Sequence, residues 1–174
     1  DHNVENCLAA AAICYFAGID RNMIAETLVS FGGVEHRIEF TGELNGVKFY
    51  NDSKGTNVDA AIIALRAIKG NIILIAGGDG KGQEFDELIK NFGKVKKLVL
   101  IGRDGKIIAD TAQHLGYSNY VFGRDMDECV KIAFAAAEPG DTVLLSPACA
   151  SWDMYDNFEQ RGKHFKECVM RLGI

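Results

Sequence analysis

The spacing of apolar residues predicts two architectures in succession. In residues 3–17, apolar side chains such as Val4 and Leu8 recur at intervals of three and four, as on one face of an α-helix. A second helical pattern covers residues 21–30, and two glycines then interrupt the periodicity. We therefore expect a boundary at Gly32-Gly33, with a helical pair before it and a different architecture after it.

Beyond residue 37 the pattern alternates between strands and helices. Residues 38–44 and 47–50 alternate apolar and polar positions on either side of Asn45-Gly46, a pair typical of tight β-hairpins. Nearly continuous apolar runs, typical of buried parallel strands, follow at 72–76, 97–101, 119–122 and 142–145. Helical periodicity is found at 57–68, 84–91, 106–115, 126–137 and 155–172. The sequence thus predicts a doubly wound α/β domain, Rossmann-like, with a mostly parallel sheet and a β-hairpin entry.

Three polar loops come directly after predicted strands, at residues 52–56, 77–81 and 146–153. In doubly wound sheets, ligands bind at the carboxyl ends of the strands. We therefore expect all three loops at one edge of the domain.

The length, charge and apolar runs of the chain exclude several classes of protein. A chain of 174 residues fits one domain with a short appendage. Its formal charge of -5 argues against a nucleic-acid partner, and its apolar runs are too short to cross a membrane. No signal peptide opens the chain, and a start at Asp1 is compatible with a piece of a longer protein.

The five cysteines form no CxxC pair and have no histidine at zinc-ligand spacing, so we expect no metal site among them. They are typical of reduced, mostly buried thiols in a cytosolic protein. Cys149 is a candidate nucleophile because small residues surround it. No base lies near it in sequence, and we favour a structural role for this thiol.

The first two loops each allow a plain interpretation beside the chemical one. Asp52, Lys54 and Thr56 at the start of a helix favour a bound anion, yet Asp52 or Ser53 could simply cap that helix. The glycine-dense loop at 77–81 permits close backbone approach to a ligand, but it lacks the spacing of a phosphate-binding P-loop and also fits an ordinary turn.

Five ordered motifs together carry a family resemblance. They are HNVEN at 2–6, GVEHR at 33–37, NDSKGTN at 51–57, GGDGK at 77–81 and SPACAS at 146–151, the last followed by Asp153, Asn157-Phe158 and Arg161-Gly162. The chain resembles the Mur ligases over essentially its whole length, with Gly55 in place of the usual alanine. The last two motifs are similar to those of the members that add D-glutamate. The resemblance implies that residues 1–37 are the helical tail and linker of a central ATPase domain, and that 38–174 form the complete C-terminal, amino-acid-binding domain.

The resemblance implies ATP-dependent amide bond formation through an acyl phosphate. Lys54 would be catalytic, stabilising the charge near the transferred phosphate. The D-glutamate ligands would be Thr56, Lys81, Ser151, Trp152 through its backbone, and Phe158. The nucleotide ligands would be Asn6 at the adenine, Arg37, and Asp52 at the ribose. Further candidates are Asn3, His36 and Arg161.

The same resemblance implies ATP with Mg²⁺ as cofactor, with the metal ligands and the P-loop in upstream domains of the same polypeptide. The substrates would be D-glutamate, ATP and UDP-N-acetylmuramoyl-L-alanine, in the bacterial cytoplasm, without a membrane or nucleic-acid partner. The chain alone should then be inactive.

Two alternatives stay open at this point. Folylpolyglutamate synthetases and other Mur ligases share the architecture, although the DNPR motif of the meso-diaminopimelate-adding member is absent from this sequence. A non-catalytic nucleotide- or anion-binding module is the other alternative, and it would have no need of the segment at 146–151.

Overall fold

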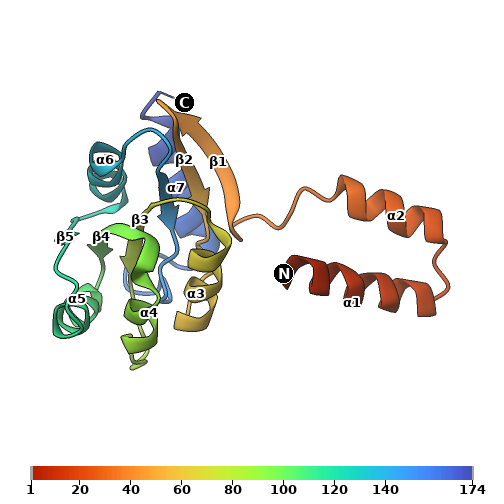
Figure 1. Cartoon of the computed structure of the whole chain (residues 1–174), viewed down its shortest axis with the longest axis horizontal. Coiled ribbons are helices and arrows are strands. Elements are labelled where there is room, and N and C mark those ends of the chain that lie inside the picture. Colours follow the sequence, from red (N-terminus) through yellow and green to blue (C-terminus); the bar gives the residue numbers. More distant parts are fainter. Residues whose placement is uncertain (1, 174) are drawn as a thin grey trace. The chain divides into compact units, whose positions relative to one another are not determined.

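The structure is a computed structural model that describes residues 2–173, with side chains from residue 4 onward. It divides into two compact units, 1–33 and 34–174. In the first, α1 (His2–Phe16) and α2 (Arg21–Ser30) form a helical hairpin (Figure 1). The Asp20 carboxylate starts α2 by accepting hydrogen bonds from the backbone N–H groups of Asn22 and Met23. Within the described residues, no helix is long and apolar enough to cross a membrane.

The second unit alternates strands and helices along the chain. Its elements are β1 (Glu39–Leu44), β2 (Val47–Asn51), α3 (Val58–Ala67), β3 (Ile72–Gly77), α4 (Asp86–Lys90), the 3₁₀ turn η1 (Phe92–Lys94), β4 (Val95–Ile101), α5 (Gly105–His114), β5 (Tyr120–Phe122), α6 (Met126–Ala136), β6 (Thr142–Leu145) and α7 (Phe158–Met170).

The strands form one six-stranded sheet in the order β1-β2-β6-β3-β4-β5. Only the β1–β2 pair is antiparallel. Asn45 and Gly46 join that pair with φ angles of 52° and 79°, the left-handed values that a two-residue hairpin turn requires. The predicted fold class, with its hairpin entry and parallel sheet, is confirmed.

Helices cover both faces of this sheet. Ile72, Leu74 and Ala76 of β3 pack with α3, α4 and α5 in one buried cluster, whereas Ile73 and Ile75 pack with α6 and α7 in another. The alternation follows from the strand geometry, in which successive side chains point to opposite faces. A strand buried on both faces must be apolar throughout, which explains the continuous run that the sequence carries.

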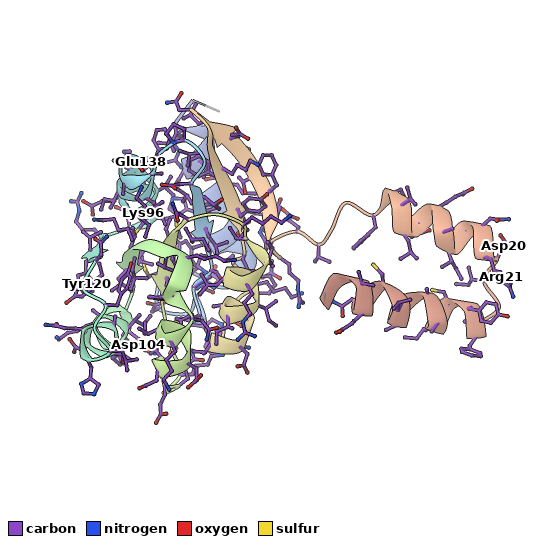
Figure 2. The ribbon with its side chains drawn as sticks, viewed as in Figure 1. Asp20, Arg21, Lys96, Asp104, Tyr120 and Glu138 are labelled. Atoms are coloured by element: carbon purple, nitrogen blue, oxygen red, sulfur yellow. The ribbon has the colours of Figure 1, made fainter. Side chains whose placement is uncertain are left out.

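Several predicted boundaries differ from the structure by one to three residues, and two of these differences have a clear physical cause. Strand β4 begins at Val95 rather than at residue 97, because Val95 is buried. The neighbouring Lys96 reaches the carboxylate of Glu138 at 2.6 Å (Figure 2) and that of Asp141 at 3.0 Å. Helix α7 begins at Phe158 rather than at residue 155. Asn157 caps it by accepting from the backbone N–H of Gln160, so the residues before Asn157 form a turn.

Candidate functional site

The polar loops gather at one edge of the sheet. Strands β2, β6 and β3 are parallel neighbours, so the chain leaves each of them at the same edge. The loops that follow contain residues 52–57, 146–157 and 78–85. The loop after β4, at 102–104, leaves this edge as well. The topology therefore brings together the segments that the sequence singled out.

Gln83 ties three of these loops to one another. Its amide oxygen accepts a hydrogen bond from the backbone N–H of Val58 at 3.2 Å, and its amide nitrogen donates to the carbonyl of Ala148 at 2.6 Å. Asp79 and Ala150 also exchange two backbone hydrogen bonds, of 2.9 and 2.8 Å. These hydrogen bonds hold the loops after β2, β3 and β6 together, so that they form one continuous surface.

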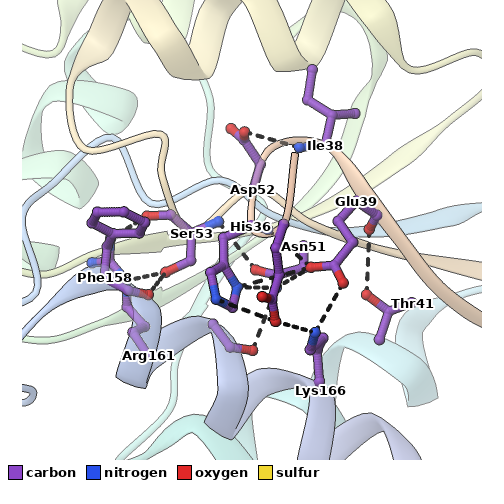
Figure 3. A network of polar contacts seen from close by, with 12 residues as sticks. His36, Ile38, Glu39, Thr41, Asn51, Asp52, Ser53, Phe158, Arg161 and Lys166 are labelled. Atoms are coloured by element: carbon purple, nitrogen blue, oxygen red, sulfur yellow. Dashed lines mark hydrogen bonds and ion pairs between the residues drawn. The ribbon is translucent and has the colours of Figure 1, made fainter. Parts of the chain in front are cut away.

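Arg161 is a buried cation that hydrogen-bonds to the loops after β2 and β6. Its Nε donates to the Ser53 hydroxyl at 3.0 Å and its Nη2 to the Ser53 carbonyl at 2.8 Å (Figure 3), while its Nη1 donates to the Cys149 carbonyl at 3.0 Å. Burial lowers the pKa of Arg161 to about 10, so the guanidinium keeps its charge at neutral pH. Arg161, a candidate by motif alone, thus holds the loop after β2 to the loop after β6.

Asp52 is buried and both of its carboxylate oxygens are engaged. Oδ1 accepts from the backbone N–H of Ile38 at 3.2 Å, and Oδ2 accepts from the Ser146 hydroxyl at 2.7 Å. Burial raises the pKa of Asp52 to about 6. Gly55 makes room for this arrangement, because a Cβ there would lie 2.5 Å from Oδ2. Each oxygen can accept one further hydrogen bond, but Asp52 is only 4% exposed, so little of the carboxylate is within reach of a nucleotide ribose.

A polar network fixes the start of the second unit. The buried Asn51 donates from its amide nitrogen to Nδ1 of His36 at 2.9 Å and to Glu39 at 3.0 Å (Figure 3). Glu35, His36 and Glu39 bring their potential metal-ligand atoms within 4.8 Å of one another. The Lys166 ammonium already donates to Glu35 and Glu39, at 2.8 and 2.9 Å. The group is therefore a hydrogen-bond network in which one lysine bridges two carboxylates and His36 has a structural place.

Two exposed lysines lie over aromatic rings at this edge. The Lys54 ammonium is 5.6 Å from the centroid of the Phe158 ring, and the Lys81 ammonium is 5.0 Å from that of Trp152. Such contacts orient an ammonium while leaving its N–H groups open. A small molecule with carboxylates or phosphates would meet two oriented cations here.

The other predicted site residues differ in their setting. Thr56 is half-buried just before α3, and Ser151 is buried, with its carbonyl accepting from the N–H groups of Met154 and Tyr155. Arg37 is exposed at the start of the second unit. Asn6 is exposed on α1, in the first unit, and the side chain of Asn3 lies outside the described residues.

Cys149 lies beneath the loops and carries no sign of reactivity. Its side chain is fully buried, and burial raises the pKa of the thiol to about 12. A nucleophilic cysteine needs the thiolate at neutral pH. The geometry therefore supports the structural role favoured for this residue.

Sequence reasoning missed Gln83 and Arg103. Gln83 carries no motif signal, since its role depends on partners 25 and 65 residues away. The Arg103 loop had a signal: it is a short polar segment directly after a predicted strand, as the other three loops are.

Comparisons with known proteins identify the family of this chain. Residues 36–149 match the family model described as Mur ligase, glutamate ligase domain. The chain is 58% identical, over 99% of its length, to the UDP-N-acetylmuramoylalanine-D-glutamate ligase of Thermoanaerobacter sp. (strain X514), of which it covers 38%. It is 55% identical to the enzyme of the same name from Caldanaerobacter subterraneus, over 99% of this chain and 39% of that protein.

A solved structure shares the fold at lower identity. It is the UDP-N-acetylmuramate-alanine ligase of Thermotoga maritima, with a TM-score of 0.72 and 20% identity, over 98% of this chain and 38% of that one. The chain thus spans less than half the length of the proteins that it matches. The family model covers most of the second unit, and two relatives exceed half identity over nearly the whole chain. The chain therefore belongs to the Mur ligase family and carries its glutamate ligase domain.

Proposed function

We propose that this chain is the amino-acid-binding part of an ATP-dependent ligase that joins D-glutamate to UDP-N-acetylmuramoyl-L-alanine, a step of peptidoglycan precursor synthesis for the bacterial cell wall, in the cytoplasm. The observation that carries the proposal is the Lys81 ammonium over the Trp152 ring, at an edge where three tied loops converge. The high identity to D-glutamate ligases supports the choice of amino acid.

D-Glutamate presents two carboxylates, so its binding site needs donors at two ends. We assign Lys81 and the Thr56 hydroxyl to one carboxylate. Ser151, the backbone of Trp152 and Phe158 would hold the other end. A charge-assisted bond from Lys81 to a carboxylate is the strongest single contact in this set. The tied loops keep these groups in place before the ligand arrives, which favours a productive orientation of the amine.

The residues at this edge fit a nucleotide phosphate but not its metal. Lys54 and Arg37 are exposed cations that could hold the phosphates of ATP, with Asp52 at the ribose. The family resemblance alone suggests Asn6, a residue of the first unit, as the adenine ligand. When bound, ATP supplies the phosphoryl group that activates the acceptor carboxylate, and Lys54 would stabilise the charge near it. The group of potential metal ligands found among the described residues, Glu35, His36 and Glu39, is already engaged by the Lys166 ammonium. We therefore assign the Mg²⁺ ligands to upstream domains.

The assignment is tested by Lys81→Ala in the full-length enzyme. Loss of one charge-assisted bond removes roughly 1.5–3 kcal/mol, so KM for D-glutamate should rise on the order of ten- to a hundredfold, and KM for ATP should change little. Steady-state kinetics with each substrate varied in turn measures both constants.

Lys106→Ala is the matched control for this variant. Lys106 is an exposed lysine of α5 whose ammonium pairs with Asp110 one turn away, so its loss should leave both constants unchanged. A Lys81→Ala enzyme with an unchanged KM for D-glutamate and a raised KM for ATP would place Lys81 at the nucleotide instead.

A further inference from the structure

Lys81 holds an unusual backbone conformation for its residue type. Its φ angle is 53°, in the left-handed region that most non-glycine residues avoid. The turn is held by Asp79, whose Oδ1 accepts the backbone N–H of Lys81 at 3.0 Å. Asp79 therefore sets the direction in which the Lys81 side chain leaves the loop.

The same carboxylate is a potential competitor for the Lys81 ammonium, because it lies only two residues away. Yet in the described part of the chain no carboxylate oxygen lies within 4.0 Å of that ammonium, which instead lies over the Trp152 ring. Asp79 Oδ1 pairs with the Arg103 guanidinium. The N–H of Lys81 and the guanidinium of Arg103 hold the pKa of Asp79 below its ordinary value, so the carboxylate stays ionised.

The loop of Arg103 is itself fixed on both sides. The backbone N–H of Arg103 donates to Asp153 Oδ2 at 2.8 Å. Asp104, labelled in Figure 2, accepts the N–H of Gly80 at 2.6 Å and donates its own N–H to the carbonyl of Gly78 at 3.0 Å. The backbone of Arg103 is thus anchored beside both Asp79 and the segment that contains Trp152.

We propose that Arg103 is a positioning residue: by pairing with Asp79 it keeps that carboxylate from capturing Lys81, and so leaves the Lys81 ammonium on Trp152, free for a substrate carboxylate. Arg103 is 61% exposed and Asp79 is 14% exposed, so the pair is partly open to solvent and contributes only modestly to folding stability. We therefore expect the loss of Arg103 to change the position of the Lys81 ammonium more than the stability of the fold. The proposal deepens the proposed function, since the use of Lys81 for D-glutamate rests on it.

Trp152 allows the position of Lys81 to be measured without any substrate, because it is the single tryptophan of the chain. In the 174-residue chain, Lys81→Met removes the ammonium from the ring and gives a reference change in tryptophan emission. Arg103→Ala should shift the emission in the same direction, by at least half as much. Arg124→Ala should leave the spectrum unchanged, because this exposed arginine pairs with Glu128 of α6, outside the loops around Trp152.

The double variant Arg103→Ala/Asp79→Asn separates positioning from general disruption. Asparagine keeps the oxygen that accepts the N–H of Lys81 but removes the competing charge, so the emission should return to that of the unsubstituted chain. Recovery would also show that the loss of Arg103 had not unfolded the domain. The proposal is overturned if Lys81→Met leaves the emission unchanged, if Arg103→Ala does so while Lys81→Met shifts it, or if the double variant stays shifted.

Kinetics of the full-length enzyme then test the link to substrate. Arg103→Ala should raise KM for D-glutamate about tenfold, and the double variant should lower it again. If the emission changes as expected while KM for D-glutamate stays constant, the positioning of Lys81 stands, and its assignment to D-glutamate is wrong.

Discussion

At the scale of single residues, Asp52 combines burial, two accepted hydrogen bonds and an altered acidity. Burial raises the pKa of Asp52 from 3.8 to about 6 despite the donors from Ser146 and Ile38. The folded chain therefore binds this proton more tightly than the unfolded chain does. Between about pH 4 and pH 6 the folded state holds more protons, so the contribution of Asp52 to stability falls as the pH rises through that window.

This charge leads to a prediction for Asp52→Asn. The amide can accept from Ile38 and donate to Ser146, so it keeps both bonds without a buried charge. The variant should be more stable than the parent at pH 7 by on the order of 2 kcal/mol, and the difference should vanish below about pH 4. Urea denaturation of both chains at several pH values measures it.

Asp110→Asn, at a surface position on α5, is the control and should change stability little at either pH. The opposite result would be a free energy of unfolding for Asp52→Asn that falls below that of the parent at pH 7 and matches it at pH 4. It would show that the buried carboxylate stabilises the fold.

At the scale of elements, α7 is the helix on which the site depends. Its first residue is Phe158, whose carbonyl accepts from the Ser53 hydroxyl at 2.8 Å, and one turn later Arg161 reaches both loops. The next residue, Gly162, faces His36 so closely that a Cβ would lie 2.3 Å from Nδ1 of the imidazole. This glycine lets α7 pack against the network of His36, Asn51 and Glu39.

Gly162→Ala should therefore destabilise the chain, although alanine is the better helix former. We expect a loss of about 1–3 kcal/mol in the free energy of unfolding, because His36 must leave its bond with Asn51. The helical control is Gly105→Ala at the start of α5, where the new Cβ would meet Leu100 at an ordinary 3.5 Å. That variant should be neutral or gain up to about 1 kcal/mol.

Urea midpoints of the two alanine variants compare them directly. Equal stability of both variants would mean that His36 moves aside freely, and the packing role of Gly162 would be rejected.

At the scale of the whole molecule, the chain has cationic side chains that could bind phosphates, but its sequence contains no P-loop motif. Phosphoryl transfer needs a phosphate cradle and a metal ion in addition to the groups found here. We therefore predict that the 174-residue chain, incubated with ATP and Mg²⁺, releases phosphate no faster than a boiled sample, with the full-length enzyme plus its substrates as the positive control. Phosphate release by the chain alone, dependent on Lys54, would reveal an ATPase site within these residues.

Local patterns in the sequence were enough to predict the α/β class, the hairpin at Asn45-Gly46 and the common edge of the polar loops. Each of these rests on short-range physics: strands buried on both faces are apolar throughout, and left-handed turns favour Asn-Gly. The motifs pointed to Arg161 as well, but not to its function. That function became visible only when Ser53 and Cys149, 108 and 12 residues away in the chain, were seen at its guanidinium.

Three features could not be predicted from the sequence, all for the same reason. They are the raised pKa of Asp52, the pairing of Asp79 with Arg103 and the hydrogen bonds by which Gln83 joins the loops. Each is a property of side chains that meet only after the sheet has formed. The pKa of Asp52 depends on its burial beside Ser146, 94 residues away. The partner of Asp79 could equally have been Lys81, which lies nearer in sequence, and only the fixed loop after β4 brings Arg103 to it. Periodicity reports which face of an element is buried, whereas charge and hydrogen bonding depend on which elements meet at that face.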